Sequence, residues 1–204
     1  QIEELAGAME MRNQQAIFGF TGTKEDGNTL ATATDSAQVQ IVIDPSNEDL
    51  PCELAAAVGA IRCYEAGLTN LLPLNYVQIP GRSLPRSSMV DTDIEYCLQH
   101  GLTPLIQSGN RLAICRSITT YLTDDAGNTS DVLLDTLTVD SAFETRRVLK
   151  ESWRKFARAK VTDDTLRAIR SDTLQCLIGL EKRNIVEMVE EFKDDIVVER
   201  DSQV

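Results

Sequence analysis

The sequence predicts an α/β fold, in which a small mixed β-sheet is flanked by helices and the C-terminal portion of the chain is rich in helix. Two short apolar runs, at residues 16–20 and 39–43, indicate buried strands, and helical periodicity follows the second run. A strand, a loop, a second strand and then a helix are typical of α/β proteins. From about residue 141, apolar side chains recur at helical spacing instead.

The first half of the chain alternates strands with helices. Pro51 suits the first turn of a helix because its missing N–H would be unpaired there, and Gly67 is a natural stop. Pro73, Pro80 and Pro85 then keep the following connection irregular. The predicted elements are a helix at 2–13, a strand at 16–20, a loop at 21–29, a helical turn at 31–37, a strand at 39–43, a helix at 51–66, an irregular connection at 68–90 and a helix at 91–100.

The second half of the chain begins with a predicted hairpin and continues as helices. Gly109 and Asn110 accept positive φ at low cost, which makes the hairpin turn a strong signal. Leu149, Trp153 and Phe156 mark the apolar stripe of a long helix. The predicted elements are hairpin arms at 104–107 and 111–121, a turn at 123–128, helices at 141–159 and 162–184, a short helix at 187–192 and a closing strand at 196–198.

The bulk properties of the chain exclude several classes of partner. The formal net charge is −12 and the isoelectric point is about 4.5, and a surface of that sign repels nucleic acid and anionic membranes. No apolar run reaches the roughly 18 residues that a membrane span needs, and no signal peptide is evident. The five cysteines form no CxxC pair and are odd in number, which favours reduced core residues from a cytoplasmic assembly environment. Because the chain opens on Gln1, we expect it to be a piece of a longer protein.

No catalytic constellation stands out, so we predict that the protein is not an enzyme and has no catalytic, cofactor-binding or metal-ligating residues. His100 is the only histidine, and its place at a predicted helix end suits a structural cation. Residues 19–24 follow a strand, as a phosphate-binding loop would, but Thr23 separates Gly22 from Lys24 and the P-loop pattern is not met. One alternative stays open, a small cytoplasmic α/β enzyme that binds a phosphorylated ligand through residues 19–29.

The charged residues of the C-terminal part segregate into two groups. The basic group lies on the long predicted helix and consists of Arg146, Arg147, Lys150, Arg154, Lys155, Arg158 and Lys160. The acidic group consists of Glu187, Glu190, Glu191, Asp194, Asp195, Glu199 and Asp201. Each group is either a solvated face or a surface that pairs with another copy of the protein, and repetition in a polymer would multiply contacts that are weak singly. The first six basic and the first five acidic residues form our candidate assembly interface.

Several segments of the chain, taken in order, carry a family resemblance. Residues 116–123 have the pattern Arg-x-Ile-Thr-Thr-Tyr-x-Thr. They are preceded by Gly101-Leu102-Thr103-Pro104-Leu105 and a hairpin, and are followed by Leu134-Asp135 and by the ending at 185–201. Over about residues 38–201, this order resembles the contractile tail sheath proteins of Mu-like bacteriophages.

The resemblance implies a structural subunit that polymerises helically around an inner tail tube and contracts to drive the tube into the host during genome delivery. The implied partners are other copies of the chain, the inner tail tube protein, and baseplate and tail terminator proteins. The implied location is the virion tail, after assembly in the bacterial host cytoplasm, with no cofactor.

The resemblance also implies how the chain is organised. Residues 1–103 would be the α/β part of a sheath domain, and 104–204 the hairpin and helical part that completes it as one compact unit. We expect the terminal arms of the family to be missing from this chain. A non-sheath tail or baseplate module is the second alternative.

Overall fold

The computed structural model describes residues 14–66, 71–124 and 126–200. The chain divides into two compact units between Asp140 and Ser141, within helix α5 (Thr136–Trp153). The helix predicted at 2–13 lies outside the described residues. The division of a single sheath domain at residues 103 and 104 stays a prediction, and this boundary falls inside strand β4 (Leu102–Ser108).

The N-terminal unit is built on a five-stranded sheet with the order β1-β2-β4-β5-β3. Strands β1, β2 and β4 are parallel, whereas β5 runs antiparallel to both β4 and β3, so the predicted mixed sheet is confirmed. Phe18 of β1 lies opposite Ile41 of β2, which in turn lies opposite Leu102 of β4. The other strands are β1 (Ala16–Phe20), β2 (Val39–Ile43), β5 (Arg111–Ile114) and β3 (Gln78–Ile79).

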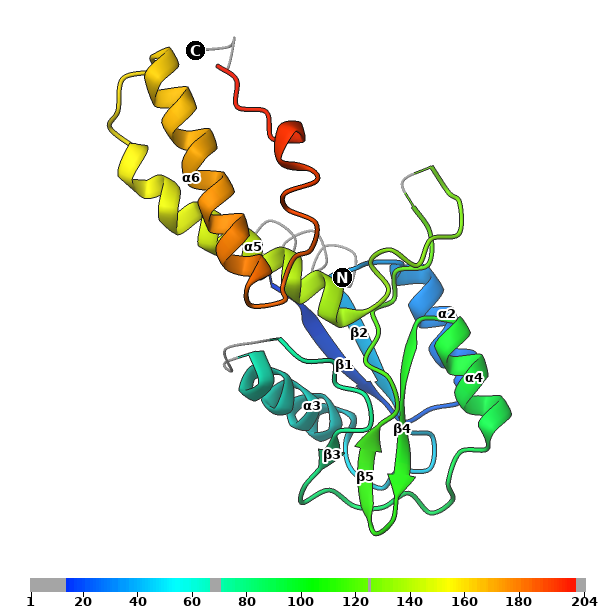
Figure 1. Cartoon of the computed structure of the whole chain (residues 1–204). Coiled ribbons are helices and arrows are strands. Elements are labelled where there is room, and N and C mark those ends of the chain that lie inside the picture. Colours follow the sequence, from blue (N-terminus) through cyan, green and yellow to red (C-terminus); the bar gives the residue numbers. More distant parts are fainter. Residues whose placement is uncertain (1–13, 67–70, 125, 201–204) are drawn as a thin grey trace. The chain divides into compact units, whose positions relative to one another are not determined.

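Helices cover both faces of this sheet (Figure 1). Helix α3 (Pro51–Ala66) packs on one face, and α2 (Lys24–Thr34) and α4 (Asp91–Gln99) pack on the other. Successive side chains of a strand point to opposite faces, so the buried strand β2 contributes to both layers. Val42 joins the cluster under α3, and Ile41 joins the cluster under α2 and α4. The α/β architecture predicted from the two apolar runs is therefore confirmed.

The loop predicted at 21–29 is wrong, because α2 begins at Lys24. The Thr23 hydroxyl caps the helix by accepting a hydrogen bond from the backbone N–H of Asp26, and the acidic side chains of the first turn favour the same helix end. Gly and Thr lower helix propensity here, but burial of Ala31 against the sheet outweighs that local preference. The helical turn predicted at 31–37 is the last part of α2, which ends at Thr34.

Most other elements of the N-terminal unit agree with the predictions. The strands at 16–20 and 39–43 and the helix at 51–66 are confirmed, and the helix predicted at 91–100 ends one residue earlier. The irregular connection contains the short strand β3. The second hairpin arm is shorter than predicted, because β5 ends at Ile114 and residues 116–121 leave the ladder.

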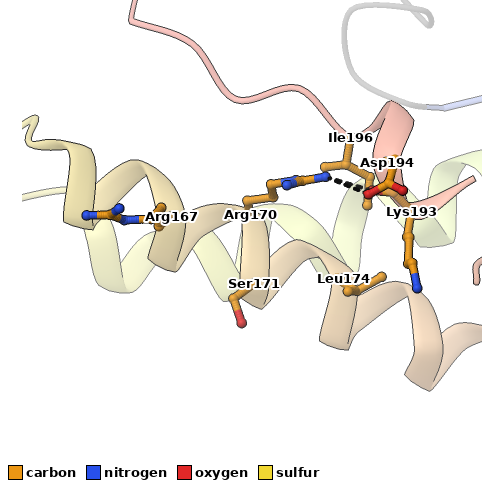
Figure 2. Close-up of a pocket in the computed structure, with 7 residues that line it drawn as sticks. All are labelled: Arg167, Arg170, Ser171, Leu174, Lys193, Asp194 and Ile196. Carbon is orange, nitrogen blue, oxygen red and sulfur yellow. Dashed lines mark hydrogen bonds and ion pairs between the residues drawn. The ribbon is translucent and has the colours of Figure 1, made fainter.

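The C-terminal unit comprises the rest of α5, a 3₁₀ turn at Arg154–Phe156, helix α6 (Asp163–Glu181) and an extended tail with a 3₁₀ turn at Lys193–Asp195. The helix predicted at 141–159 thus begins earlier, at Thr136, and ends earlier, at Trp153. The short helix at 187–192 and the strand at 196–198 are wrong. Instead of pairing in the sheet, the tail lies along α6, where Arg170 contacts Asp194 at 3.4 Å beside a cavity of about 300 Å³ (Figure 2).

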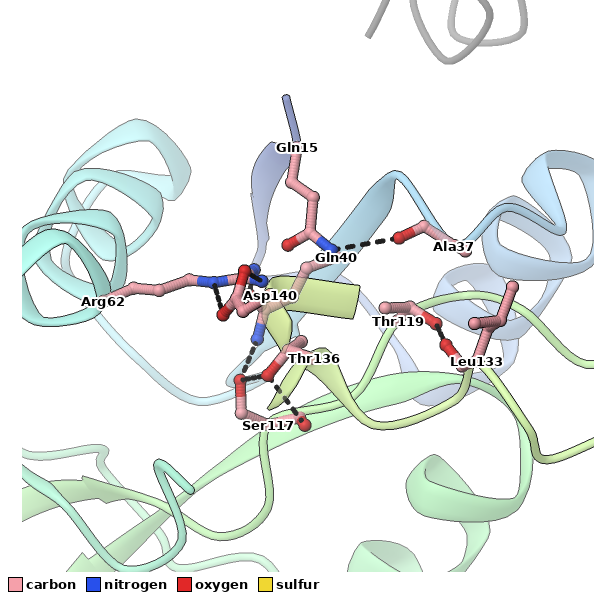
Figure 3. A network of polar contacts seen from close by, with 9 residues as sticks. All are labelled: Gln15, Ala37, Gln40, Arg62, Ser117, Thr119, Leu133, Thr136 and Asp140. Atoms are coloured by element: carbon pink, nitrogen blue, oxygen red, sulfur yellow. Dashed lines mark hydrogen bonds and ion pairs between the residues drawn. The ribbon is translucent and has the colours of Figure 1, made fainter. Parts of the chain in front are cut away.

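A buried polar network crosses the α3 face of the sheet (Figure 3). Arg62 of α3, which is 8% exposed, makes a bidentate ion pair with Asp140 at 2.7 and 3.1 Å and donates to Oε1 of Gln40 at 3.2 Å. Nε2 of Gln40 in turn donates to Ser117 at 2.8 Å. The same nitrogen donates to Thr103 at 3.1 Å. A buried polar group is costly unless it is hydrogen-bonded, so each member of the network depends on the next.

The segment 116–121, which carries the family resemblance, is fixed by its own polar side chains. Arg116 forms a bidentate pair with Asp135 at 2.7 and 3.0 Å. The hydroxyls of Thr119 and Thr120 donate to backbone carbonyls at 2.8 and 3.1 Å. The pattern therefore has a structural reason, since these polar side chains hold the segment in place after β5 ends at Ile114.

Replacing Arg62 with Met should lower the free energy of unfolding by about 3 kcal/mol, because Asp140 and Gln40 lose their buried partner. Urea denaturation followed by circular dichroism would measure the loss as a lower midpoint. The matched control is Arg111→Met in the exposed hairpin turn, where we expect a change of less than about 0.5 kcal/mol. Equal losses in both variants would contradict the role of the network.

Candidate assembly interface

Helices α5 and α6 form an antiparallel hairpin in the C-terminal unit. At one end, Nε1 of Trp153 donates to the Thr173 hydroxyl at 3.1 Å. At the other end, Arg183 contacts Glu144 at 3.0 Å. The later residue of α5 contacts the earlier residue on the side of α6, so the two helices run antiparallel. This hairpin presents the basic residues that the sequence singled out.

The predicted basic residues are all exposed, as the helical pattern suggested. Arg146, Arg147 and Lys150 lie within one turn of α5, and Arg154 follows four residues after Lys150, so together they occupy one side of the helix. Lys155 and Arg158 extend the group past the helix end, and so does the outlying Lys160. The stripe predicted from sequence is therefore present on the surface.

Several of these cations already have partners within the chain. Arg147 pairs with Glu144 at 2.7 Å and with Glu151 at 3.2 Å, and Lys155 pairs with Asp172. Arg146 also takes part in an interaction within the chain. By contrast, the side chains of Lys150, Arg154 and Arg158 make no hydrogen bond or ion pair with any residue in the described part of the chain. We call these three residues the basic rim.

The predicted acidic residues are likewise exposed and only partly engaged. Glu190 pairs with Lys193, and Asp194 pairs with Arg170 of α6. Over residues 14–66, 71–124 and 126–200, no ion pair joins the basic group to the acidic group, and no partner is seen for Glu187, Glu191 and Asp195. Of the two outlying acidic residues, Glu199 lines a groove beside α5, and Asp201 lies outside the described residues.

The tail runs antiparallel to α6 and is tied to it at three levels. The backbone N–H of Val189 donates to Glu181 at 3.0 Å, near the end of the helix. Arg170 holds the carbonyl of Lys193 at 3.2 Å. Arg200 pairs with Asp163 at 2.8 Å, at the start of the helix. Because the last two ties are exposed, each contributes little to stability.

An apolar groove of about 600 Å³ lies between the hairpin and the tail. Trp153, which is 40% exposed, and Phe156 form its aromatic part. Its other lining residues are Leu149, Ala157, Ile169, Thr173, Ile196, Val197, Val198 and Glu199. The sequence indicated the apolar stripe on α5, but it missed the groove because residues 196–198 were predicted to pair as a strand. No local signal would have shown where they pack.

The ion pairs of the hairpin shift the titration of their members. Hydrogen bonds from Arg147, and then from Arg183, hold the pKa of Glu144 below its ordinary value despite partial burial. Lys155 and Ser152 lower the pKa of Asp172 in the same way. Each carboxylate is therefore ionised at neutral pH and stabilises the α5–α6 hairpin.

Two kinds of feature are absent from the described residues. Among them, no group of His, Cys, Asp and Glu side chains is arranged to hold a metal ion. Within the same residues, no helix is long and apolar enough to cross a membrane.

Comparisons with known proteins place the fold among components of phage-type tails. The structure is similar to a sheath tail protein of Desulfitobacterium hafniense, with a TM-score of 0.60 and 16% identity over 88% of this chain and 48% of the other. It is similar to a chain of the anti-feeding prophage baseplate, with a TM-score of 0.59 and 16% identity over 78% and 44% of the two chains. A sheath tail protein of Listeria innocua gives a TM-score of 0.54 and 12% identity over 82% and 46%.

This likeness establishes a sheath-like fold. The chain spans less than half the length of each of these structures. No family model matches the sequence, and no curated protein matches it. The resemblance seen in the sequence is therefore confirmed at the level of the fold, and its Mu-like detail stays a prediction.

Replacing Glu144 with Gln should lower the stability of the protein by about 1 kcal/mol at pH 7, because Arg147 and Arg183 lose their shared carboxylate. The folded-state pKa of Glu144 is lowered from 4.5, so its contribution is full above that pH and is lost as the pH falls through the lowered value. Thermal unfolding of both proteins from pH 7 downward should show their melting temperatures converging. The exposed Glu151→Gln variant is the control and should lose less; a gap that stays constant with pH would contradict the assignment.

Proposed function

We propose that this chain is part of a structural subunit of a contractile tail sheath of the Mu-like phage type. In this role, copies polymerise helically around an inner tail tube and contract to drive the tube into the host during genome delivery. The observation that carries the proposal is a fold shared with two sheath tail proteins over 88% and 82% of the chain. The ordered motifs of the sequence, and the structural role of residues 116–121, support it.

The same proposal names partners and a location. The partners are other copies of the chain, the inner tube protein, and baseplate and tail terminator proteins; nucleic acid and membranes are not among them. The protein acts in the virion tail, after assembly in the host cytoplasm, and does not catalyse a reaction. Residues 1–103 and 104–204 together form its sheath domain. An acidic chain with a basic stripe suits contacts between unlike surfaces of identical subunits.

A second candidate is a baseplate module that does not form a sheath. The similarity to a chain of the anti-feeding prophage baseplate favours it. The two candidates differ in their assembly, since a sheath subunit builds long tubes whereas a baseplate module stops at a closed ring.

A phosphate-binding enzyme is disfavoured by the geometry of the crevice where its ligand would bind. The crevice, of about 530 Å³, lies beyond the carboxyl ends of β1 and β2, the usual ligand edge of a parallel sheet. Lys24, its basic residue, is paired with Asp93. Glu25 and Asp26 add negative charge to the first turn of α2. This edge therefore opposes a phosphate.

Electron microscopy of the intact protein that contains this chain, expressed together with its tube protein, tests the proposal. We expect long sheathed tubes in extended and contracted forms. Closed rings without tubes would support the baseplate module instead. A protein that stays dispersed would overturn the proposal.

A thermal-shift screen of the 204-residue chain with ATP, GTP and sugar phosphates tests the enzyme alternative. We expect no rise in melting temperature, because the crevice offers no unpaired cation among its lining residues. Lys24→Ala is the matched variant. A rise that disappears in Lys24→Ala would revive the enzyme.

A further inference from the structure

The tail carries an exposed apolar pair within an acidic stretch. Met188 is 56% exposed and Phe192 is 53% exposed. The N–H of Phe192 donates to the carbonyl of Met188 at 3.2 Å, so a tight turn brings the backbones of these two residues close together. The acidic residues Glu187, Glu191 and Asp195 neighbour the pair in the chain. We call residues 187–195 the acidic ridge.

The backbone of the ridge is strained at this apolar pair. Met188 has φ of 59°, a left-handed conformation that is strained for a residue with a side chain. Such strain persists only where neighbouring contacts hold it, and the buried Ile185 and Val189 on either side anchor this stretch. The strain thus presents an apolar side chain to solvent, where it is stabilised only if a partner covers it.

The groove of the same unit has the complementary character. Its aromatic floor at Trp153 and Phe156 is apolar and partly exposed. The basic rim neighbours these residues in the chain, since Arg154 follows Trp153 and Arg158 lies two positions after Phe156. An apolar floor with unpaired cations beside it suits an apolar pair flanked by carboxylates.

We propose that the acidic ridge of one copy docks into the groove and basic rim of a second copy. In the described residues the two surfaces make no ion pair with each other within one chain, so they remain available to a neighbour. Met188 and Phe192 enter beside Trp153, while Glu187, Glu191 and Asp195 face Lys150, Arg154 and Arg158. The contact joins unlike surfaces and repeats along a filament. It rests on the proposed sheath function and names the surfaces by which copies meet.

A peptide of residues 185–196 tests the docking directly, with the fluorescence of Trp153, the only tryptophan of the chain, as the readout. We expect saturable binding that weakens as salt is added. A peptide with Met188→Asp and Phe192→Asp should bind at least about tenfold more weakly, because both apolar anchors are lost. A peptide with Ile185→Asp and Val189→Asp should bind as the wild type does.

The two peptide variants distinguish docking onto the groove from displacement of the chain's own tail by the peptide. If binding depends on Ile185 and Val189 instead, the peptide displaces the chain's own tail, and the proposal is overturned. A scrambled peptide of the same composition controls for binding through charge alone. If it binds as tightly as the wild-type peptide, the proposal is overturned.

A charge swap in the 204-residue chain tests the contact between copies. Arg154→Glu and Glu191→Arg should each weaken self-association, measured by sedimentation, by roughly fivefold or more, and the double variant should restore it. Arg111→Glu, which makes the same change of net charge in the hairpin turn, should leave association unchanged. Failure of the double variant to recover would overturn the proposal.

The outcomes for the two proposals can be told apart. Sheathed tubes of the intact protein that tolerate both single reversals would leave the sheath function standing and refute the docking contact. Peptide binding with the expected variant pattern, in a protein that builds no tubes, would refute the sheath function and leave a self-association surface.

Discussion

The fold depends on one constraint: a glutamine and an arginine are buried on the face of the sheet that α3 covers, and both must find partners. Gln40 alternates with Val42 on this face, so it lies where apolar packing would otherwise be continuous. Arg62 reaches it from α3 and continues to Asp140. Leaving any of these groups unpaired would cost more than their hydrogen bonds contribute. The network thereby fixes how β2, α3 and the first turns of α5 meet.

The strands and α3 could be predicted because their signals are local. Residues 39–43 are a continuous apolar run, and Pro51 marks a helix start whatever the rest of the chain does. Helix α2 was missed because glycine and threonine weaken its local preference, while burial of Ala31 decides the outcome from a distance. The ion pair between Arg62 and Asp140 joins positions 78 residues apart, and no local pattern reports such a contact.

The sequence could predict which residues of the candidate interface are exposed, but not which of them form ion pairs within the chain. Helical spacing alone placed the basic residues on an exposed side of α5. It did not show that Arg147 and Lys155 are engaged within the chain by Glu144 and Asp172, because these contacts depend on side-chain reach and on the turn between the helices. The strand predicted in the tail was wrong for a related reason. An apolar run such as residues 196–198 becomes a strand only where a partner strand is present.

The division between engaged and unpaired charges bears on how such a surface works. Engaged pairs such as Glu144 with Arg183 stabilise the hairpin, so their loss would lower the stability of each copy even without a neighbour. The side chains of Lys150 and Arg154 make no ion pair with residues 14–66, 71–124 or 126–200, so a neighbour could pair with them without breaking a bond seen in this part of the chain. One exposed ion pair contributes at most about 1 kcal/mol. If copies of the chain polymerise as we propose, repetition would multiply contacts of this strength. Each contact would also be weak enough to be released and remade when neighbouring subunits change their relative angle.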